Sequence, residues 1–395
     1  MGSRVSTALK LETYGTPEAA LLMAASSGNP SSASVRRLME HRIDWALLTR
    51  LAVESHATVA LWEVVSGFPG LPGETKVLQS LAVINDFRRH HIRNFVSRIS
   101  RDLELEGIQV LVMKGAALLI GGVSRPIART MSDIDLLVVS GSPDKAWELC
   151  RQRGWTLYDE TLTPELYREH HHLPPLLDPD GVNIGLELHR ILLPGLDLLG
   201  LDVGGIMERS RLIRVGNTSV RVPGVEDLLV HACLHFAWSN KLRHAAWRAF
   251  ADCHAIISDP AFNWDRFLAA LSSRRTKQCC YWTLRLGRVI ADLDVPDDVL
   301  ARLDPAGGGR MANLIERHFV TQLSDYSAEA AIAERVQRWL WLAALRESSS
   351  REAEQLFDLG ALEVAAPGGS AHRRRGALTA ALRTGGYFAR LLTRG

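Results

Sequence analysis

The spacing of apolar residues predicts helices in the two outer parts of the chain and short strands between them. From residue 35 to 107, apolar residues recur every three or four positions, as in WALLTRLAVESHATVALWEVV, a spacing typical of amphipathic helices. The same spacing returns between residues 225 and 348. Residues 1–34 are weakly patterned and end in SSGNPSSAS, so we expect a mobile leader there.

The strand-like segments lie between these two helical parts. They are short apolar or alternating runs bounded by turn-forming residues. Six extended segments are expected, at 108–113, 134–139, 154–158, 182–189, 212–215 and 219–222. GNT before the last of them suits a hairpin turn. The fold class expected is therefore α+β, with a small mixed β-sheet core flanked by N-terminal and C-terminal helical regions.

Breaks in the pattern predict how the chain is organised. Glycine-rich stretches at 307–309 and 366–370 are the best later linkers. We expect a leader at 1–34, a helical region at 35–107, an α/β core at 108–224, a second helical region at 225–365 and a basic tail at 366–395. The tail has six arginines and no acid, so it is either docked or frayed, or it contacts an anionic surface.

Composition narrows the protein class only loosely. With 47% hydrophobic and 23% charged residues, the chain has the make-up of a soluble globular protein. A formal net charge of +2 indicates no special partner. The five cysteines are never spaced as CxxC, which argues against a zinc knuckle and suits a reducing compartment. No apolar run is long enough for a transmembrane segment, and a cytoplasmic location is expected.

The most informative residues are two acids in an apolar run. Asp135 lies in the strand expected at 134–139, and Asp133 comes directly before it. Because side chains alternate along extended backbone, both carboxylates point to the same face. Two buried carboxylates side by side repel each other and lose hydration unless a cation compensates them. Hard divalent cations are the usual partners of such a pair. The pair therefore predicts half of a site for Mg²⁺ or Mn²⁺.

A third acid and a set of polar residues complete the predicted site. Glu187, in GLELHR, would let the acids hold two metals, which together can clamp the attacking and leaving oxygens of a phosphoryl displacement. Glu187 or a metal-bound water would accept the acceptor's proton. The phosphates of an NTP would be held by four kinds of group: the ammonium of a lysine, backbone N–H donors at a tight glycine turn, the guanidinium groups of two arginines and the hydroxyl of a serine. The residues expected in these roles are Lys114, Gly115, Arg125, Arg129 and Ser132.

The ordered series KGAALL, then SDIDLLV, then LELHR resembles a family of mostly uncharacterised nucleotidyltransferases of the DNA-polymerase-β-like superfamily. In that superfamily a glycine-containing turn precedes a DxD strand, and a third acid lies on a later strand. The resemblance implies that Asp133, Asp135 and Glu187 match the metal acids and that Lys114 and Gly115 take the place of the turn motif. The chain departs from the superfamily in having Lys-Gly instead of Gly-Ser and a longer gap before the acids.

The resulting prediction is Mg²⁺-dependent transfer of a nucleoside monophosphate from an NTP to an acceptor, with release of pyrophosphate. The acceptor is open: a small molecule, a sugar, a peptide or a protein is favoured over RNA. Two other functions fit the same acids. A nucleotide-sugar glycosyltransferase also uses a DxD, but it would need a βαβ unit upstream, where this chain has a helical pattern. A non-catalytic nucleotide-binding protein of the same fold is the third possibility.

Several polar residues have no assigned role in this prediction. The run of histidines at 170–172 is expected to divide between solvent and substrate, because adjacent residues in a helix or strand cannot all face one ion. His189 shares the face of Glu187 and either holds the acceptor or pairs with the acid. His231 and His235 suit a packed helix with partly buried histidines. Asp252 is expected to be a helix-surface acid, with a nucleotide or acceptor contact as the alternative.

Overall fold

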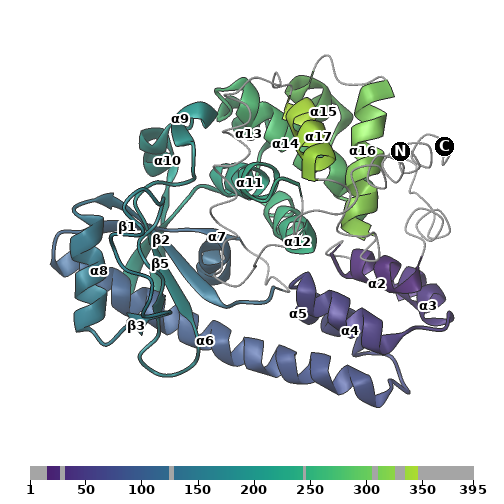
Figure 1. The fold of residues 1–395 in the computed structure, drawn as a ribbon, viewed down its shortest axis with the longest axis horizontal. Helices are drawn as coiled ribbons and strands as arrows, with labels where there is room; N and C mark the ends of the chain where they lie inside the picture. The colour runs from purple at the N-terminus through teal and green to yellow at the C-terminus, as the bar shows by residue number, and fades with distance from the viewer. Residues whose placement is uncertain are drawn as a thin grey trace, which may run out of the picture.

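The computed structural model describes residues 16–26, 32–123, 129–242, 246–304, 310–324 and 334–345. Two β-sheets lie between residues 109 and 222, and helices precede and follow them (Figure 1). The α+β class with helical flanks, predicted from the sequence, is confirmed. The strands are β1 (Gln109–Val112), β2 (Asp133–Ser140), β3 (Thr156–Leu157), β4 (Leu176–Leu177), β5 (Gly185–His189), β6 (Arg211–Val215) and β7 (Thr218–Val222).

The N-terminal helices carry the chain to one side of the sheet. They are α2 (Pro17–Ser26), α3 (Ser32–Met39), α4 (Trp45–Glu54), α5 (Thr58–Val65), the short η1 (Gly73–Thr75) and α6 (Lys76–Leu105). In Figure 1, α6 runs along the lower edge of the molecule from α4 and α5 to the sheet. Its C-terminal half buries Phe95, Val96 and Ile99, and α6 contacts both β1 and β7. This long helix therefore joins the N-terminal helices to the sheet.

The predicted mobile leader is wrong for residues 17–26. These residues form α2, whose Leu21, Leu22 and Met23 are fully buried. The helix contacts α5 and also α12 and α14 from the C-terminal part of the chain. Its sequence, PEAALLMAAS, is apolar nearly all round, which is the composition of a buried helix instead of an amphipathic one. The neighbours that bury it are distant in sequence, so local patterning could not reveal it.

The larger sheet has the strand order β1-β2-β5-β4-β3. Strands β2 and β5 run parallel, with Asp135 opposite Glu187, and the other neighbouring pairs are antiparallel. A parallel pair needs a long crossover, and here the crossover contains helix α8 (Pro143–Gln152). The side chain of Ser142 caps α8 by accepting a hydrogen bond from the backbone N–H of Lys145, and Pro143 begins the helix. The smaller sheet is the expected hairpin β6–β7, with Gly216 at a φ of +60° in its turn.

Helices from the C-terminal part of the chain lie above and to the right of the larger sheet in Figure 1. Between the sheets and these helices are α7 (Lys114–Ala117), the π-helical turn η2 (Leu118–Gly122), α9 (Leu196–Leu199) and α10 (Val203–Arg209). The C-terminal set consists of α11 (Val225–Leu234), the π-helical η3 (His235–Ser239), α12 (Ala246–Ile257), α13 (Trp264–Ala269), α14 (Arg274–Ala291), α15 (Asp297–Leu303), α16 (Arg310–Ser324) and α17 (Glu334–Leu345). Helix α7 contacts both β2 and α11, and thus lies between the larger sheet and the C-terminal helices (Figure 1).

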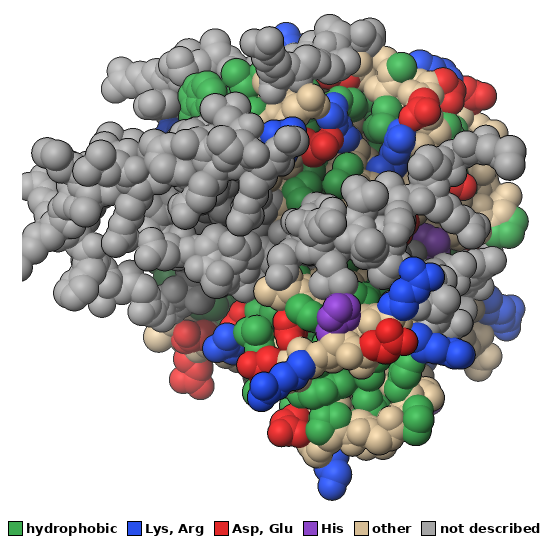
Figure 2. Space-filling view, turned by 90° about the vertical axis from the view of Figure 1, so that its right-hand side faces the viewer, with side chains coloured by type: hydrophobic (Ala, Val, Ile, Leu, Met, Phe, Trp, Pro, Cys, Tyr) green, Lys and Arg blue, Asp and Glu red, His purple; other side chains and the backbone are tan. Residues whose placement is uncertain are grey.

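The described surface has no marked charge asymmetry on the face drawn in Figure 2. Basic and acidic side chains are interspersed there among apolar ones, as the small net charge of the chain leads one to expect. The five cysteines are free thiols, and all are buried. None of the described helices combines the length and the apolar content needed to cross a membrane.

Candidate functional site

Three carboxylates come together on one face of the larger sheet. Asp133 and Asp135 lie on β2, and Glu187 lies on β5 directly opposite Asp135 in the parallel register. Side chains two residues apart on a strand, and register partners on its neighbour, point to the same face. Asp135 is almost fully buried, whereas Asp133 and Glu187 are half-buried. The sheet therefore presents the three acids to the same space.

Two nitrogen atoms bridge Asp135 and Glu187. The ammonium of Lys114 lies 2.7 Å from Oδ1 of Asp135 and 3.9 Å from Oε2 of Glu187. Nε2 of His189 lies 3.0 Å from the same oxygen of Asp135 and 3.4 Å from that of Glu187. Because a carboxylate oxygen can only accept, Nε2 of His189 carries the proton it donates. His189 thus pairs with the acids, the second of the two roles expected for it.

These contacts shift the pKa values of the acids in different directions. Burial favours a raised pKa for Asp135, but the Lys114 ammonium and the His189 hydrogen bond outweigh it and hold that pKa well below its ordinary value. Glu187 has a lowered pKa because the same two neighbours outweigh its burial. Asp133 is different: burial, with the charge of Asp135, raises its pKa. Asp133 is therefore the acid whose charge the protein compensates least.

Lys114 is placed beside the acids by a strained turn. At the end of β1 the backbone N–H of Met113 donates to the carbonyl of Asp135 over 3.0 Å, which brings the next residue alongside that acid. Lys114 then adopts a φ of +48°, in the left-handed region that costs a residue with a Cβ about 1 kcal/mol. Burial lowers the pKa of Lys114, but Asp135 and Glu187 outweigh it and raise the pKa above its usual range. Strain of this kind is common where a fold fixes a functional side chain.

Gly115 is needed because Arg129 packs directly against it. A Cβ at position 115 would lie 2.5 Å from Nε of Arg129. The guanidinium of Arg129 is buried and forms an ion pair with Asp252 of α12. The side chain of Asn85 fixes the backbone around Arg129, donating to its carbonyl over 3.0 Å and accepting from the N–H of Met131 over 2.6 Å. The expectation that Asp252 is a surface acid is wrong, since it is buried against Arg129.

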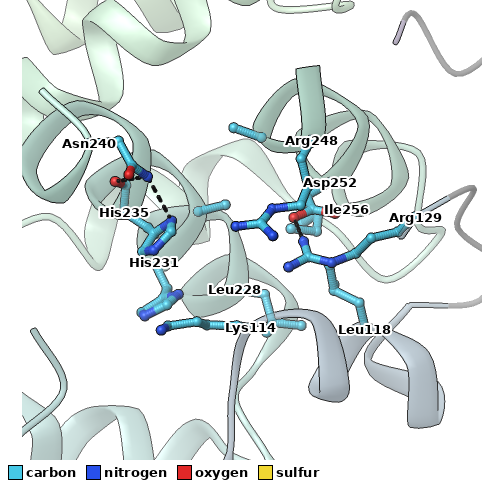
Figure 3. A pocket seen from close by; sticks show the side chains of 12 residues that line it. Lys114, Leu118, Arg129, Leu228, His231, His235, Asn240, Arg248, Asp252 and Ile256 are labelled. Atoms are coloured by element: carbon cyan, nitrogen blue, oxygen red, sulfur yellow. Dashed lines mark hydrogen bonds and ion pairs between the residues drawn. The ribbon is translucent and has the colours of Figure 1, made fainter. Parts of the chain in front are cut away.

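A pocket that is partly open to solvent lies next to the acids and includes Lys114, which contacts Asp135, in its lining. Figure 3 shows Lys114 and Arg129 reaching it from one side and residues of α11, η3 and α12 from the other. Its lining residues are Lys114, Leu118, Arg129, Leu228, His231, Ala232, His235, Asn240, Arg248, Ala249, Asp252 and Ile256. His231 and His235, expected to be partly buried on a packed helix, both face this pocket. Three cationic side chains and one acid give it a positive balance.

Arg248 is the charged residue of the pocket that the sequence did not point to. Burial and the nearby charge of Arg129 lower its pKa, and the charge of Arg248 in turn favours the ionised form of Asp133. Arg248 and Asp252 are four residues apart on α12, so both face the same side of that helix. No motif in the sequence marks Arg248, because α12 reaches the site through packing against other helices, chiefly α11 and α2.

The other residues singled out from the sequence are Arg125, Ser132 and the histidines at 170–172, and none of those that the structure describes lines the pocket. Arg125 lies outside the described residues. The side chain of Ser132 is exposed, and its carbonyl accepts a hydrogen bond of 2.8 Å from the N–H of Gly185, which ties the start of β2 to β5. His171 and His172 are buried near His189, with ring centroids 5.3 and 5.4 Å from its ring. Burial lowers the pKa of His172 to about 4.

The acids fit a hard divalent cation. Their donors are all carboxylate oxygens, which Mg²⁺ and Mn²⁺ prefer. Asp133 provides the supporting observation, because its raised pKa reflects burial and repulsion from Asp135 that a cation would relieve. A carboxylate oxygen of Asp135 and one of Glu187 also lie within 4.8 Å of each other.

Comparison with known proteins gives a family relationship. A family model described as uncharacterised nucleotidyltransferase matches residues 41–291, well over half of the chain. The matched range contains the acids, Lys114, Gly115 and the pocket residues of α11 and α12. A search of curated proteins finds no match to the chain.

Proposed function

The chain belongs to the uncharacterised nucleotidyltransferase family, and from this premise we propose that it transfers a nucleoside monophosphate from an NTP to an acceptor and releases pyrophosphate. The observation that carries the proposal is the convergence of Asp133, Asp135 and Glu187 beside a cationic pocket. Residues 108–224 would form the catalytic core, with α11 and α12 completing the nucleotide pocket.

Asp133, Asp135 and Glu187 would hold Mg²⁺ or Mn²⁺. Such ions supply charge stabilisation to the phosphoryl oxygens when bound. The chain's own contribution is to hold the three acids in fixed positions and to keep Asp135 and Glu187 ionised. Lys114 and His189 do this for Asp135 and Glu187 through the contacts described above. Phosphoryl transfer depends mainly on positioning and charge, so a site of this kind needs few covalent participants.

The pocket cations would bind the triphosphate. Lys114 and Arg248 offer charged donors next to the acids, and a guanidinium can bind phosphate oxygens in a bidentate manner. Arg129 is already paired with Asp252, so its main contribution is to fix the turn at Gly115 and the base of the pocket. Gly115, Arg125 and Ser132 stay in the proposal as nucleotide contacts. The acceptor would enter from the side of Glu187.

In the proposed reaction an acceptor oxygen or nitrogen forms a bond to the α-phosphorus, and the bond from that phosphorus to the β-phosphate oxygen breaks. Pyrophosphate leaves, and the acceptor's proton passes to Glu187 or to solvent. Glu187 is assigned this role because its carboxylate lies beside the other two acids and an ionised carboxylate oxygen can accept a proton. The acceptor is proposed to be a small molecule, a sugar, a peptide or a protein. The buried free thiols accord with a reducing compartment such as the cytoplasm.

The test is a screen of the full chain with each α-labelled NTP, with Mg²⁺ or Mn²⁺, against fractionated cell extract. We expect labelled product and an equal amount of pyrophosphate. Asp133→Asn should lower turnover by about 100-fold or more, because it removes charge stabilisation at the reacting phosphate. Arg248→Gln should raise KM for the NTP by about tenfold, the effect of losing roughly 1.4 kcal/mol of phosphate binding.

Matched controls make the same chemical changes elsewhere. Asp298→Asn alters an exposed acid of α15, and Arg302→Gln alters an arginine paired with the exposed Asp265. Both should retain the activity of the unchanged protein. Wild-type turnover by Asp133→Asn would refute the metal assignment. Release of a nucleoside diphosphate from a nucleotide sugar would indicate a glycosyltransferase, and nucleotide binding without turnover across all acceptors would indicate a non-catalytic protein.

A further inference from the structure

The three consecutive histidines form a compact cluster beside His189 of β5, whose ring centroid lies 5.3 Å from that of His171 and 5.4 Å from that of His172. One ring nitrogen from each of His170, His171 and His172 lies within 4.8 Å of those of the other two. Their ring centroids are 4.2 to 4.6 Å apart. His171 and His172 are each only 7% exposed. The three rings are therefore packed against one another, and two of them lie almost entirely away from solvent.

The backbone explains how adjacent residues can converge, contrary to the sequence-based expectation. The segment is neither helix nor strand: the N–H of His170 closes a turn onto the carbonyl of Tyr167 over 3.1 Å. Beyond this turn, His172 forms an isolated antiparallel bridge with His189. The N–H of Arg190 donates to the carbonyl of His171 over 2.8 Å. The change from turn to bridge within three residues rotates all three rings toward one point.

The hydrogen bonding of His172 suits metal ligation. Its Nδ1 lies 2.6 Å from the carbonyl oxygen of Leu173, and since a carbonyl can only accept, Nδ1 carries the proton. The lone pair of this neutral ring is then on Nε2. Metal-binding histidines usually donate their other ring N–H to a carbonyl or carboxylate in this way. His189 belongs to a different group of potential ligands, with Asp135 and Glu187, and its Nε2 donates to those acids.

We propose that His170, His171 and His172 bind one transition-metal ion of the zinc class, at a site separate from the three carboxylates. Imidazole nitrogens suit Zn²⁺ and similar ions, whereas Mg²⁺ prefers oxygen. Three protein ligands leave one position of a tetrahedral ion for water or a substrate atom. The proposal does not depend on nucleotidyl transfer.

The first experiment uses the untagged full chain, because a histidine tag would itself bind zinc. The protein is freed of metal with a chelator and titrated with Zn²⁺ in a calorimeter in the presence of excess Mg²⁺. We expect one equivalent to bind and the thermal unfolding temperature to rise, since a ligand that binds only the folded state stabilises it. Co²⁺ in place of Zn²⁺ should give the visible absorption of a tetrahedral nitrogen-bound ion. Absence of saturable Zn²⁺ binding would overturn the proposal.

The second experiment locates the ion. His170→Ala and His171→Ala should each weaken Zn²⁺ binding by about 100-fold or more. His90→Ala, at an exposed position on α6, is the matched control and should bind as the unchanged protein does. Asp133→Asn should also retain the zinc equivalent, which separates this site from the proposed reaction. Wild-type affinity in both cluster variants would place the ion elsewhere and refute the assignment. Because the Co²⁺ spectrum uses the unchanged chain, a variant that fails to fold does not decide the result.

Discussion

At the scale of single residues, Asp133 and Asp135 show that identical side chains two positions apart can have opposite electrostatics. Asp135 has two nitrogen neighbours within 3.0 Å, and its pKa is well below normal. The pKa of Asp133 is raised, because the residue is buried and lies beside the negative charge of Asp135. The sequence places both acids on one face but says nothing about this difference, which depends on Lys114 and His189.

The two acids are therefore expected to affect stability in opposite directions when no divalent cation is present. Asp133→Asn should stabilise the fold at neutral pH by about 1 kcal/mol, because it removes a buried charge that Asp135 repels. Asp135→Asn should destabilise it by about 3 kcal/mol, because it leaves Lys114 and His189 buried without their partner. Urea unfolding of both variants at several pH values measures these differences.

The pH dependence follows from the directions of the pKa shifts. The pKa of Asp133 is higher in the folded protein than in the unfolded chain, where it is about 3.9. The charge of Asp133 therefore destabilises the fold only above that pH, and fully so above the folded pKa. The increase in the free energy of unfolding caused by Asp133→Asn should accordingly develop as pH rises through the folded pKa and vanish below about pH 3.9. Asp135 has a depressed folded pKa, so its contribution is present above about pH 3.9 and is lost as pH falls toward the folded pKa. Equal effects of the two substitutions at neutral pH would contradict this account.

At the scale of elements, the junction of β1 and α7 organises the site. The strand predicted at 108–113 is confirmed there; the turn after it is made by Lys114, which has a positive φ, and Gly115 lies within α7, which continues as the π-helical η2. The sequence could indicate this much because strand and turn preferences are local. It could not indicate that Arg129 would lie against Gly115, since that contact depends on Asn85 of α6 and Asp252 of α12.

Gly115→Ala tests this contact. The added methyl would meet Nε and Cζ of Arg129, at 2.5 and 2.8 Å, and force the guanidinium away from Asp252. We expect a loss of about 1–3 kcal/mol in the free energy of unfolding, the usual cost of overpacking. Gly67→Ala is the control, because a Cβ there meets nothing within 4 Å and the φ of Gly67 is not positive. Chemical denaturation compares the two; equal stabilities would show that Arg129 can move freely.

At the scale of the whole molecule, α2 joins the N-terminal helices to the C-terminal ones. It contacts α5 on one side and α12 and α14 on the other, and α12 carries Arg248 and Asp252 into the pocket. A segment expected from the sequence to be mobile is thus part of the core that supports the site.

Leu22→Ala should consequently lower the free energy of unfolding by about 2–5 kcal/mol, the usual effect of truncating a fully buried leucine. Leu166→Ala, at a position 69% exposed, should change it by less than about 0.5 kcal/mol. Thermal or urea unfolding of both variants provides the comparison. If Leu22→Ala were as stable as Leu166→Ala, α2 would have no part in the core.

The sequence by itself determined what depends on neighbouring residues along the chain. The alternation of a strand puts Asp133 and Asp135 on one face, and the spacing of apolar residues separates helical parts from the sheet. Long-range packing decided the rest: the pairing of β2 with β5, the nitrogen neighbours of Asp135, Arg248 in the pocket and the histidine cluster. The physical reason is that charge pairing and burial act through space, between groups whose separation along the chain carries no local signal.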